Sequence, residues 1–122
     1  MIKRATCVLA MLVGLVGVSV PVFAHHGTAA FEDKTITLKG TVVEWSWSNP
    51  HCLLQFDVKG DDGQVVRWIG ETQNPVTQTN AGWSKASFKP GDEITITLTP
   101  AKNGRTLGRI KQVVLPSGTT LH

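Results

Sequence analysis

Cysteine, methionine and tyrosine are scarce in this chain of 122 residues, which holds two cysteines, two methionines and no tyrosine. Cys7 and both methionines lie within the first 24 residues, which leaves Cys52 as the one cysteine beyond them. A single cysteine excludes an internal disulfide there, and the absence of a Cys-x-x-Cys-His motif excludes covalent haem attachment. A copper site of the electron-transfer type would also lack its usual axial methionine.

Charged residues are missing from residues 7–24, and this gap indicates a secretory signal peptide. Two basic residues precede an apolar run over residues 8–20, and the string Val22-Phe23-Ala24 suits a cleavage site. The apolar run is too short to span a bilayer comfortably, and no second such run follows. We therefore expect cleavage after Ala24, export to the periplasm, and a mature chain that begins at His25 and has no membrane span. Its length predicts one domain over residues 25–122.

The excess of positive charge is small once the predicted signal peptide is set aside. The full chain has a formal net charge of +3, and Lys3 and Arg4 contribute two of those charges. No cluster of lysine or arginine remains in the mature chain, so we expect no nucleic-acid partner. The chain also lacks Gly-x-Ser-x-Gly, His-Glu-x-x-His and glycine-rich phosphate-loop motifs. We therefore expect a binding protein and not an enzyme.

Alternating apolar and polar residues predict an all-β domain. The expected strands cover residues 35–47, 51–59, 64–71, 92–99 and 105–115. In the first of them, the apolar phase moves from the even-numbered positions 36–42 to the odd-numbered positions 43–47. Such a change beside Gly40 predicts a β-bulge that bends the strand.

One short helix interrupts the expected strands. Asn74 suits an N-cap and Pro75 suits the first helical position, which predicts a helix over residues 75–81. The resulting order β-β-β-α-β-β is that of a small five-stranded OB-type barrel. Trp83 and Phe88 are expected to plug one end of it. The expected core residues are Leu38, Val42, Leu54, Phe56, Val58, Ile94, Ile96, Leu98 and Val114.

Short motifs are spread over the whole mature chain, beginning with the string Ala24-His25-His26-Gly27. The others are Thr37-Leu38-Lys39-Gly40-Thr41-Val42, Trp47-Ser48-Asn49-Pro50-His51, Asp62-Gly63, Gly82-Trp83, Lys89-Pro90-Gly91-Asp92 and Pro100-Ala101-Lys102-Asn103-Gly104. Together they resemble a family of small exported bacterial proteins that is catalogued as a domain of unknown function. A common form of that family has serine where this chain has Gly27. The resemblance implies export and a common fold, and it implies no activity.

The expected mature N-terminus has the chemistry of a metal site. His25 would carry a free α-amine, whose pKa is roughly 7.7–8.0, beside its own imidazole. Two nitrogens from one residue form a chelate, which suits Cu(II). The rings of His26 and His51 could complete the site, with an oxygen from Glu71 or Asp57. The opposing interpretation is that His25 and His26 form a solvated terminus with no role in binding.

His51 follows Asn49-Pro50 and is predicted on the polar face of the second strand, where a ligand could approach. The alternative is that its ring caps the turn through a hydrogen bond to the backbone. Cys52 lies in phase with Leu54 and Phe56, so we expect it in the core and away from any metal.

Tryptophan supplies a second candidate site. Trp45 and Trp47 share one face of the first expected strand, and Trp68 lies on the strand expected to pair nearby. These three side chains could form a stacking platform, or they could fill the core. The sequence thus supports two hypotheses. One is a periplasmic metal-binding protein, with copper as its ion. The other is an OB-type envelope module that binds a small envelope ligand, a saccharide or a protein, with the histidines incidental.

Overall fold

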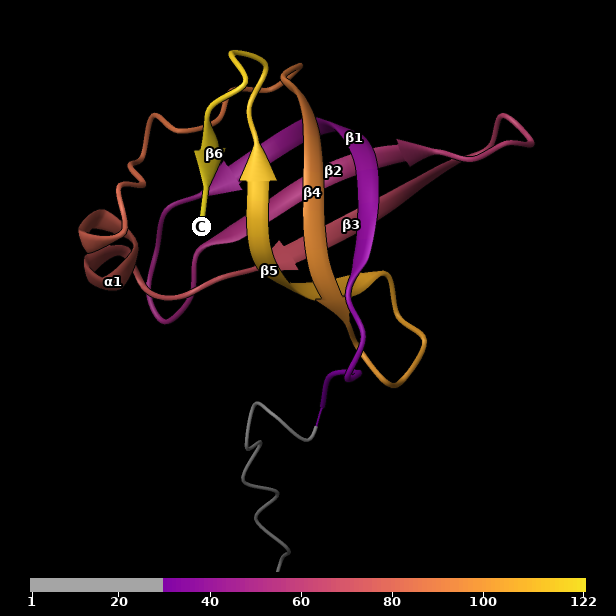
Figure 1. The fold of residues 1–122 in the computed structure, drawn as a ribbon, viewed down its shortest axis with the longest axis horizontal. Helices are drawn as coiled ribbons and strands as arrows, with labels where there is room; N and C mark the ends of the chain where they lie inside the picture. The colour runs from indigo at the N-terminus through magenta and orange to yellow at the C-terminus, as the bar shows by residue number, and fades with distance from the viewer. Residues whose placement is uncertain (1–29) are drawn as a thin grey trace, which may run out of the picture.

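The structure is a computed structural model that describes residues 30–122. The predicted signal peptide, His25 and His26 lie outside these residues. Six strands and one helix make up the described chain (Figure 1). Their bounds are β1 Ile36–Ser46, β2 Leu53–Lys59, β3 Val65–Glu71, α1 Pro75–Asn80, β4 Glu93–Pro100, β5 Leu107–Val114 and β6 Thr120–Leu121.

The first five strands close into a barrel. β1 lies between β2 and β4 and pairs antiparallel with both, while β3 pairs with β2 and β5 pairs with β4. A parallel pairing of β3 with β5 closes the sheet. The structure thus confirms the predicted all-β, five-stranded OB-type barrel with one short helix. The short β6 extends the sheet along β5 and was not predicted, because two residues carry no alternation.

β1 bends at the bulge that the change of apolar phase predicts. Its register with β2 passes through Val42, opposite Phe56, and then skips Val43. Gly40 lies nearby, at a close approach of two strands, where a Cβ would lie 2.7 Å from Phe56 Cδ2. The missing side chain therefore lets β1 curve tightly over the core.

A second bulge lies in β5 and overturns one core prediction. The register with β4 skips Lys111, so that Ile110 and Val113 are both buried in the core. Val114 is only half-buried, and its prediction as a core residue is wrong. Regular alternation along the strand would place Ile110, Gln112 and Val114 on the same face, and the extra residue shifts the inward position from Val114 to Val113.

The barrel interior is filled by large apolar side chains from β1, β2, β4 and β5. The buried cluster contains Val42, Leu54, Phe56, Trp83, Phe88, Ile94, Ile96, Leu98, Ile110 and Val113. Two further predicted core residues, Leu38 and Val58, are half-buried and pack against this cluster. Six of the nine predicted core residues are therefore buried, while Ile110 and Val113 belong to the core and were not predicted.

α1 leads into the segment that plugs one end of the barrel. The Asn74 side chain caps the helix by accepting a 3.0 Å hydrogen bond from Thr77 N–H. The helix ends at Asn80, one residue earlier than expected. Trp83 and Phe88 follow, and both are buried with their ring centroids 5.7 Å apart, as expected for a plug. Within residues 30–122, no helix is long and apolar enough to cross a membrane.

Candidate functional site

His51 lies in the connection between β1 and β2, next to the end of β3. Two backbone hydrogen bonds of 3.0 Å hold this connection in place: Cys52 N–H donates to Gln73 O, and Thr72 N–H donates to Cys52 O. They bring His51 beside Glu71, and the ring nitrogen Nδ1 contacts the carboxylate oxygen Oε1. The His51 side chain is 46% exposed and that of Glu71 is 20% exposed. The pair therefore joins an accessible imidazole to a more buried carboxylate.

The contact with Glu71 orients the His51 ring. A neutral imidazole that donates its Nδ1–H to a carboxylate keeps its lone pair on Nε2, which is the form that binds metals. The ring thus pairs with a carboxylate, whereas the alternative considered from the sequence was a bond to the turn backbone. Asp57, the other acidic residue considered for this site, pairs with Arg67 instead.

A row of contacts connects His51 with the first residues that the structure describes. Arg109 lies opposite Glu71 in the β3–β5 register. The Arg109 Cζ atom lies 4.6 Å from the centroid of the Phe31 ring, a cation–π distance. Phe31 is in turn bridged to Ala101. The described chain therefore begins on the side of the barrel that carries the His51–Glu71 pair.

The structure describes only part of the metal site that the sequence predicts. His25 and His26 lie outside the described residues, so the structure gives no position for them. Within residues 30–122, no three His, Cys, Asp or Glu side chains come together as a metal cage. Of the predicted ligands, the structure thus places His51 alone, together with the carboxylate that orients it.

The three tryptophans of the second candidate site are half-buried and pack against the core. Trp45 and Trp47 lie together, with ring centroids 5.7 Å apart. The Trp45 indole donates its Nε1–H to Ser84 O at 3.0 Å. Trp68 lies two strands away on β3, opposite Phe56 in the register. The structure therefore brings two of the three tryptophans together and leaves Trp68 apart from them.

Cys52 is fully buried, as the sequence pattern predicts. Burial raises the pKa of its thiol, while a hydrogen bond with the Ser48 backbone acts in the opposite direction. We expect a thiol reagent at neutral pH to label the folded protein at least ~100-fold more slowly than the unfolded protein, because a buried thiol is inert. Labelling with a chromogenic disulfide, with and without guanidinium, measures the ratio. Equal rates in both conditions would contradict the burial of Cys52.

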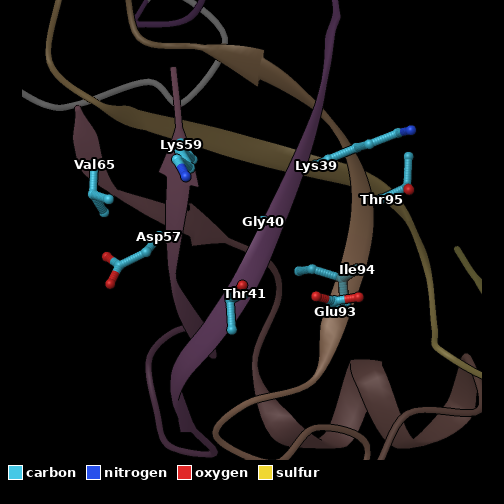
Figure 2. Close-up of a pocket in the computed structure, with 9 residues that line it drawn as sticks. All are labelled: Lys39, Gly40, Thr41, Asp57, Lys59, Val65, Glu93, Ile94 and Thr95. Atoms are coloured by element: carbon cyan, nitrogen blue, oxygen red, sulfur yellow. The ribbon is translucent and has the colours of Figure 1, made fainter. Parts of the chain in front are cut away.

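One depression on the described surface has a volume of about 590 Å³ and lies over β1 and its neighbours. Its charged lining side chains are Lys39, Asp57, Lys59 and Glu93. Figure 2 shows that these side chains lie far apart and do not converge on one point. The depression therefore has no fixed arrangement of polar groups around a ligand.

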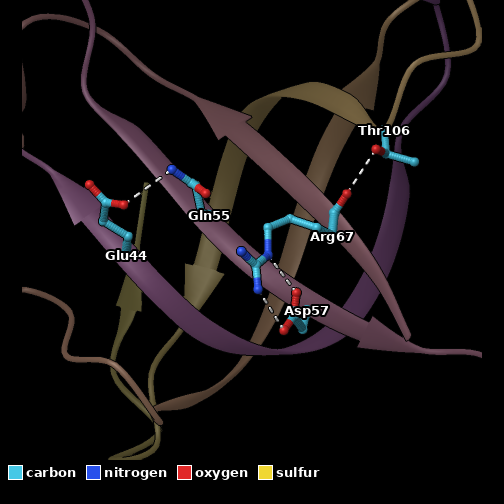
Figure 3. A network of polar contacts seen from close by, with 5 residues as sticks. All are labelled: Glu44, Gln55, Asp57, Arg67 and Thr106. Atoms are coloured by element: carbon cyan, nitrogen blue, oxygen red, sulfur yellow. Dashed lines mark hydrogen bonds and ion pairs between the residues drawn. The ribbon is translucent and has the colours of Figure 1, made fainter. Parts of the chain in front are cut away.

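A smaller groove, of about 280 Å³, lies on the outer surface where β3 meets β5. A polar network lies along it (Figure 3). The Arg67 side chain donates from Nε and Nη2 to the Asp57 carboxylate at 2.8 and 3.1 Å. The Gln55 amide donates to Glu44 at 3.3 Å, and the Thr106 hydroxyl donates to Arg67 O at 2.8 Å. Sequence analysis missed this groove, because its two sides are distant in the chain.

The ion pair between Arg67 and Asp57 stays formed over a wide range of pH. The Arg67 guanidinium holds the pKa of Asp57 below its usual value, chiefly through its hydrogen bonds to the carboxylate. The carboxylate therefore stays ionised at neutral and mildly acidic pH, and the pair stays formed. Its contribution to folding is lost only as the pH falls through the lowered pKa.

A comparison with models of protein families gives a match over most of the chain. A family model described as a family of unknown function, DUF6152, matches residues 11–111. No curated protein is similar enough to the chain to count as a match. The matched region covers most of the chain and includes β1 to β4, α1, His51 and Glu71. The chain therefore belongs to DUF6152, a family of unknown function.

Proposed function

We propose that the protein is an exported periplasmic binding protein for a divalent metal ion, with Cu(II) preferred. In this proposal the α-amine and ring of His25, the ring of His26 and the ring of His51 bind one ion. The observation that carries it is the contact between His51 Nδ1 and Glu71 Oε1, which engages one nitrogen of a 46% exposed side chain and leaves Nε2 as the nitrogen that could bind a metal. Hydrogen bonding of a ligand histidine to a carboxylate is the usual arrangement in metal sites.

The chemistry of the donor set favours copper. Every donor in it is a nitrogen, and one residue supplies two of them as a chelate. Cu(II) takes tetragonal nitrogen and oxygen ligands and binds most tightly in the Irving–Williams order. Glu71 would hold the tautomer of the His51 ring. The positive charge of the ion would also offset the carboxylate beside it.

The length of the chain permits this assembly. The five residues from His25 to Ala30 span at most about 16–18 Å when extended. Ala30 is anchored to the barrel by a 3.0 Å hydrogen bond from Lys102 N–H to its carbonyl. From Phe31, the row through Arg109 and Glu71 leads to His51. This geometry supports a return of the N-terminal segment toward His51.

Titration calorimetry of the processed protein with Cu(II) and Zn(II) tests the proposal, after intact mass has verified a start at His25. A Ser-Pro extension before His25 should weaken Cu(II) binding at least ~10-fold, because it removes the α-amine of His25 and its proline, which has no N–H, prevents a new chelate through the backbone amides. His51→Ala should weaken binding less, because one ligand is lost and the chelate stays. His122→Ala is the matched control and should leave binding unchanged. Equal binding by the extended and native proteins would contradict the proposal.

Binding should also depend on pH. The α-amine and the imidazole rings must lose protons before they bind the ion, so a falling pH opposes binding. Cu(II) affinity should therefore drop steadily between about pH 8 and pH 6. The Cu(II) affinity of the extended protein should depend less on pH above about pH 7, because its α-amine is not a ligand. Affinity that is constant over this range would exclude amine and imidazole ligands.

A second candidate function is the OB-type envelope module that binds a saccharide or a protein partner. The groove beside β3 and β5 favours it, since it combines fixed polar groups with an apolar floor. In this function the histidines would be incidental, and the processed and extended proteins would bind the ligand equally.

A further inference from the structure

The floor of the groove between β3 and β5 is apolar and rigid. Ile69 and Leu107 are direct partners in the parallel register, and both are half-buried. A 3.0 Å hydrogen bond from Ile69 N–H to Thr106 O fixes the spacing of the two chains. Two neighbouring aliphatic side chains on a fixed backbone offer a flat apolar surface of the size of one ring.

Arg67 forms one wall of the groove and is held in a single orientation. Asp57 occupies its Nε and one hydrogen of Nη2, so that Nη1 and the outer edge of the guanidinium stay available. A planar guanidinium fixed in this way presents two parallel donors to a carboxylate or to adjacent hydroxyls. Figure 3 shows the Arg67 side chain lying along the sheet toward Asp57.

Gln55 and Arg105 supply the other polar groups of the groove. The Gln55 amide donates through Nε2 to Glu44, which leaves its carbonyl oxygen as an acceptor. Arg105 lies exposed in the tight turn before β5, where its backbone N–H donates to the Asn103 side chain at 3.1 Å. Asp57 pairs with Arg67, and the Glu44 carboxylate accepts from the Gln55 amide, so Arg105 is the arginine of the lining that has no ion pair in the described chain.

We propose that this groove binds a sugar ring that carries one carboxylate, that is, a uronic acid residue. The apolar face of the ring would lie on Ile69 and Leu107. Its hydroxyls would pair with Arg67 and the Gln55 carbonyl, and its carboxylate would lie at Arg105. The volume of about 280 Å³ suits one such ring, since sites for drug-sized ligands begin at roughly 300 Å³.

The charged residues of the groove favour a uronic acid over a nucleic acid as its ligand. A phosphate chain needs a track of several basic side chains. The lining holds two arginines, and one of them is already paired with Asp57. One arginine without an ion pair, beside an apolar floor, matches a single carboxylate on a ring.

Amide chemical-shift titration of the uniformly ¹⁵N-labelled protein with digalacturonate tests the proposal. We expect the amides of Arg67, Ile69 and Leu107 to shift in a saturable way. The dimethyl ester of digalacturonate should bind at least ~10-fold more weakly, and acetate should cause no saturable shift. Equal binding of the ester would overturn the role of the carboxylate, and equal binding of acetate would overturn the role of the ring. No shift at these amides would overturn the site.

Variants in the turn before β5 identify the charge that matters. Arg105→Ala should weaken digalacturonate binding at least ~10-fold, and Arg105→Lys should weaken it less, because the charge stays and the planar fork is lost. Lys102→Ala removes a positive charge from the same exposed turn and is the matched control. Equal losses in Arg105→Ala and Lys102→Ala would overturn the assignment to Arg105. His51→Ala should leave sugar binding unchanged, which separates this site from the proposed metal site.

Discussion

Replacing Ile96 by alanine is expected to lower the free energy of unfolding by about 2–5 kcal/mol. Ile96 lies in the middle of β4, is fully buried, and belongs to the core cluster that the barrel encloses. Truncation removes three methyl or methylene groups and leaves a cavity that a closed barrel cannot easily collapse. Leu54 on β2 is equally buried, and Leu54→Ala is expected to have an effect of the same size.

Urea unfolding followed by tryptophan fluorescence measures both variants. Val76→Ala is the control, because Val76 is an aliphatic residue on α1 that is 72% exposed. Its substitution should change the free energy of unfolding by no more than about 0.5 kcal/mol. Losses below about 1 kcal/mol for both Ile96→Ala and Leu54→Ala would show that these positions do not form the core.

Gly108→Ala is expected to cost about 1–3 kcal/mol, the usual range for forcing an extra group into a packed core. Gly108 is buried in β5 at the pairing that closes the barrel. A Cβ there would overlap Leu98 Cδ1 and would lie 2.9 Å from the carbonyl oxygen of Thr99. The Leu98 side chain can turn away in part, but the backbone oxygen cannot move without disturbing the β4–β5 pairing.

Thermal and urea unfolding of Gly108→Ala test this close approach. Gly60→Ala is a matched control, because the nearest atom to its Cβ, at 2.9 Å, is the Asp62 Oδ1 end of a flexible side chain. That variant should lose less than about 1 kcal/mol. Adding Leu98→Ala to Gly108→Ala should recover part of the cost of the glycine substitution in a double-mutant cycle. An unchanged stability of Gly108→Ala would show that the two strands are less close than the geometry indicates.

Local chemistry explains which parts of the fold the sequence predicts. The bulge in β1 leaves a trace in the pattern, because the apolar phase changes next to Gly40. α1 is predicted because Asn74 and Pro75 are direct start signals for a helix. The bulge at Lys111 has no such signal beside it, so the alternation was carried past it to Val114. Bulges become visible in a sequence only where the side chains on both sides of them are distinctive.

In the candidate sites, too, the sequence predicts what depends on local residues and misses what depends on pairing between strands. The turn Asn49-Pro50 predicts that His51 starts the second strand, but His51 lies in the connection before β2, which begins at Leu53. Glu71 was one of two carboxylates considered for the His51 site. Its selection over Asp57 depends on Arg67, which lies on another strand and takes Asp57 into an ion pair. Such a choice is made by tertiary pairing, which a single sequence does not record.

The pairing of β3 with β5, which closes the barrel, joins the two proposed binding sites. β3 and β5 are joined by three register pairs, whereas β1 and β4 are joined by six. The first of the three pairs forms the floor of the groove, and the last contains Glu71, which orients His51. A sugar in the groove and a metal ion at His51 would strengthen each other's binding by the same factor only to the extent that each binds the closed seam more tightly than an open one.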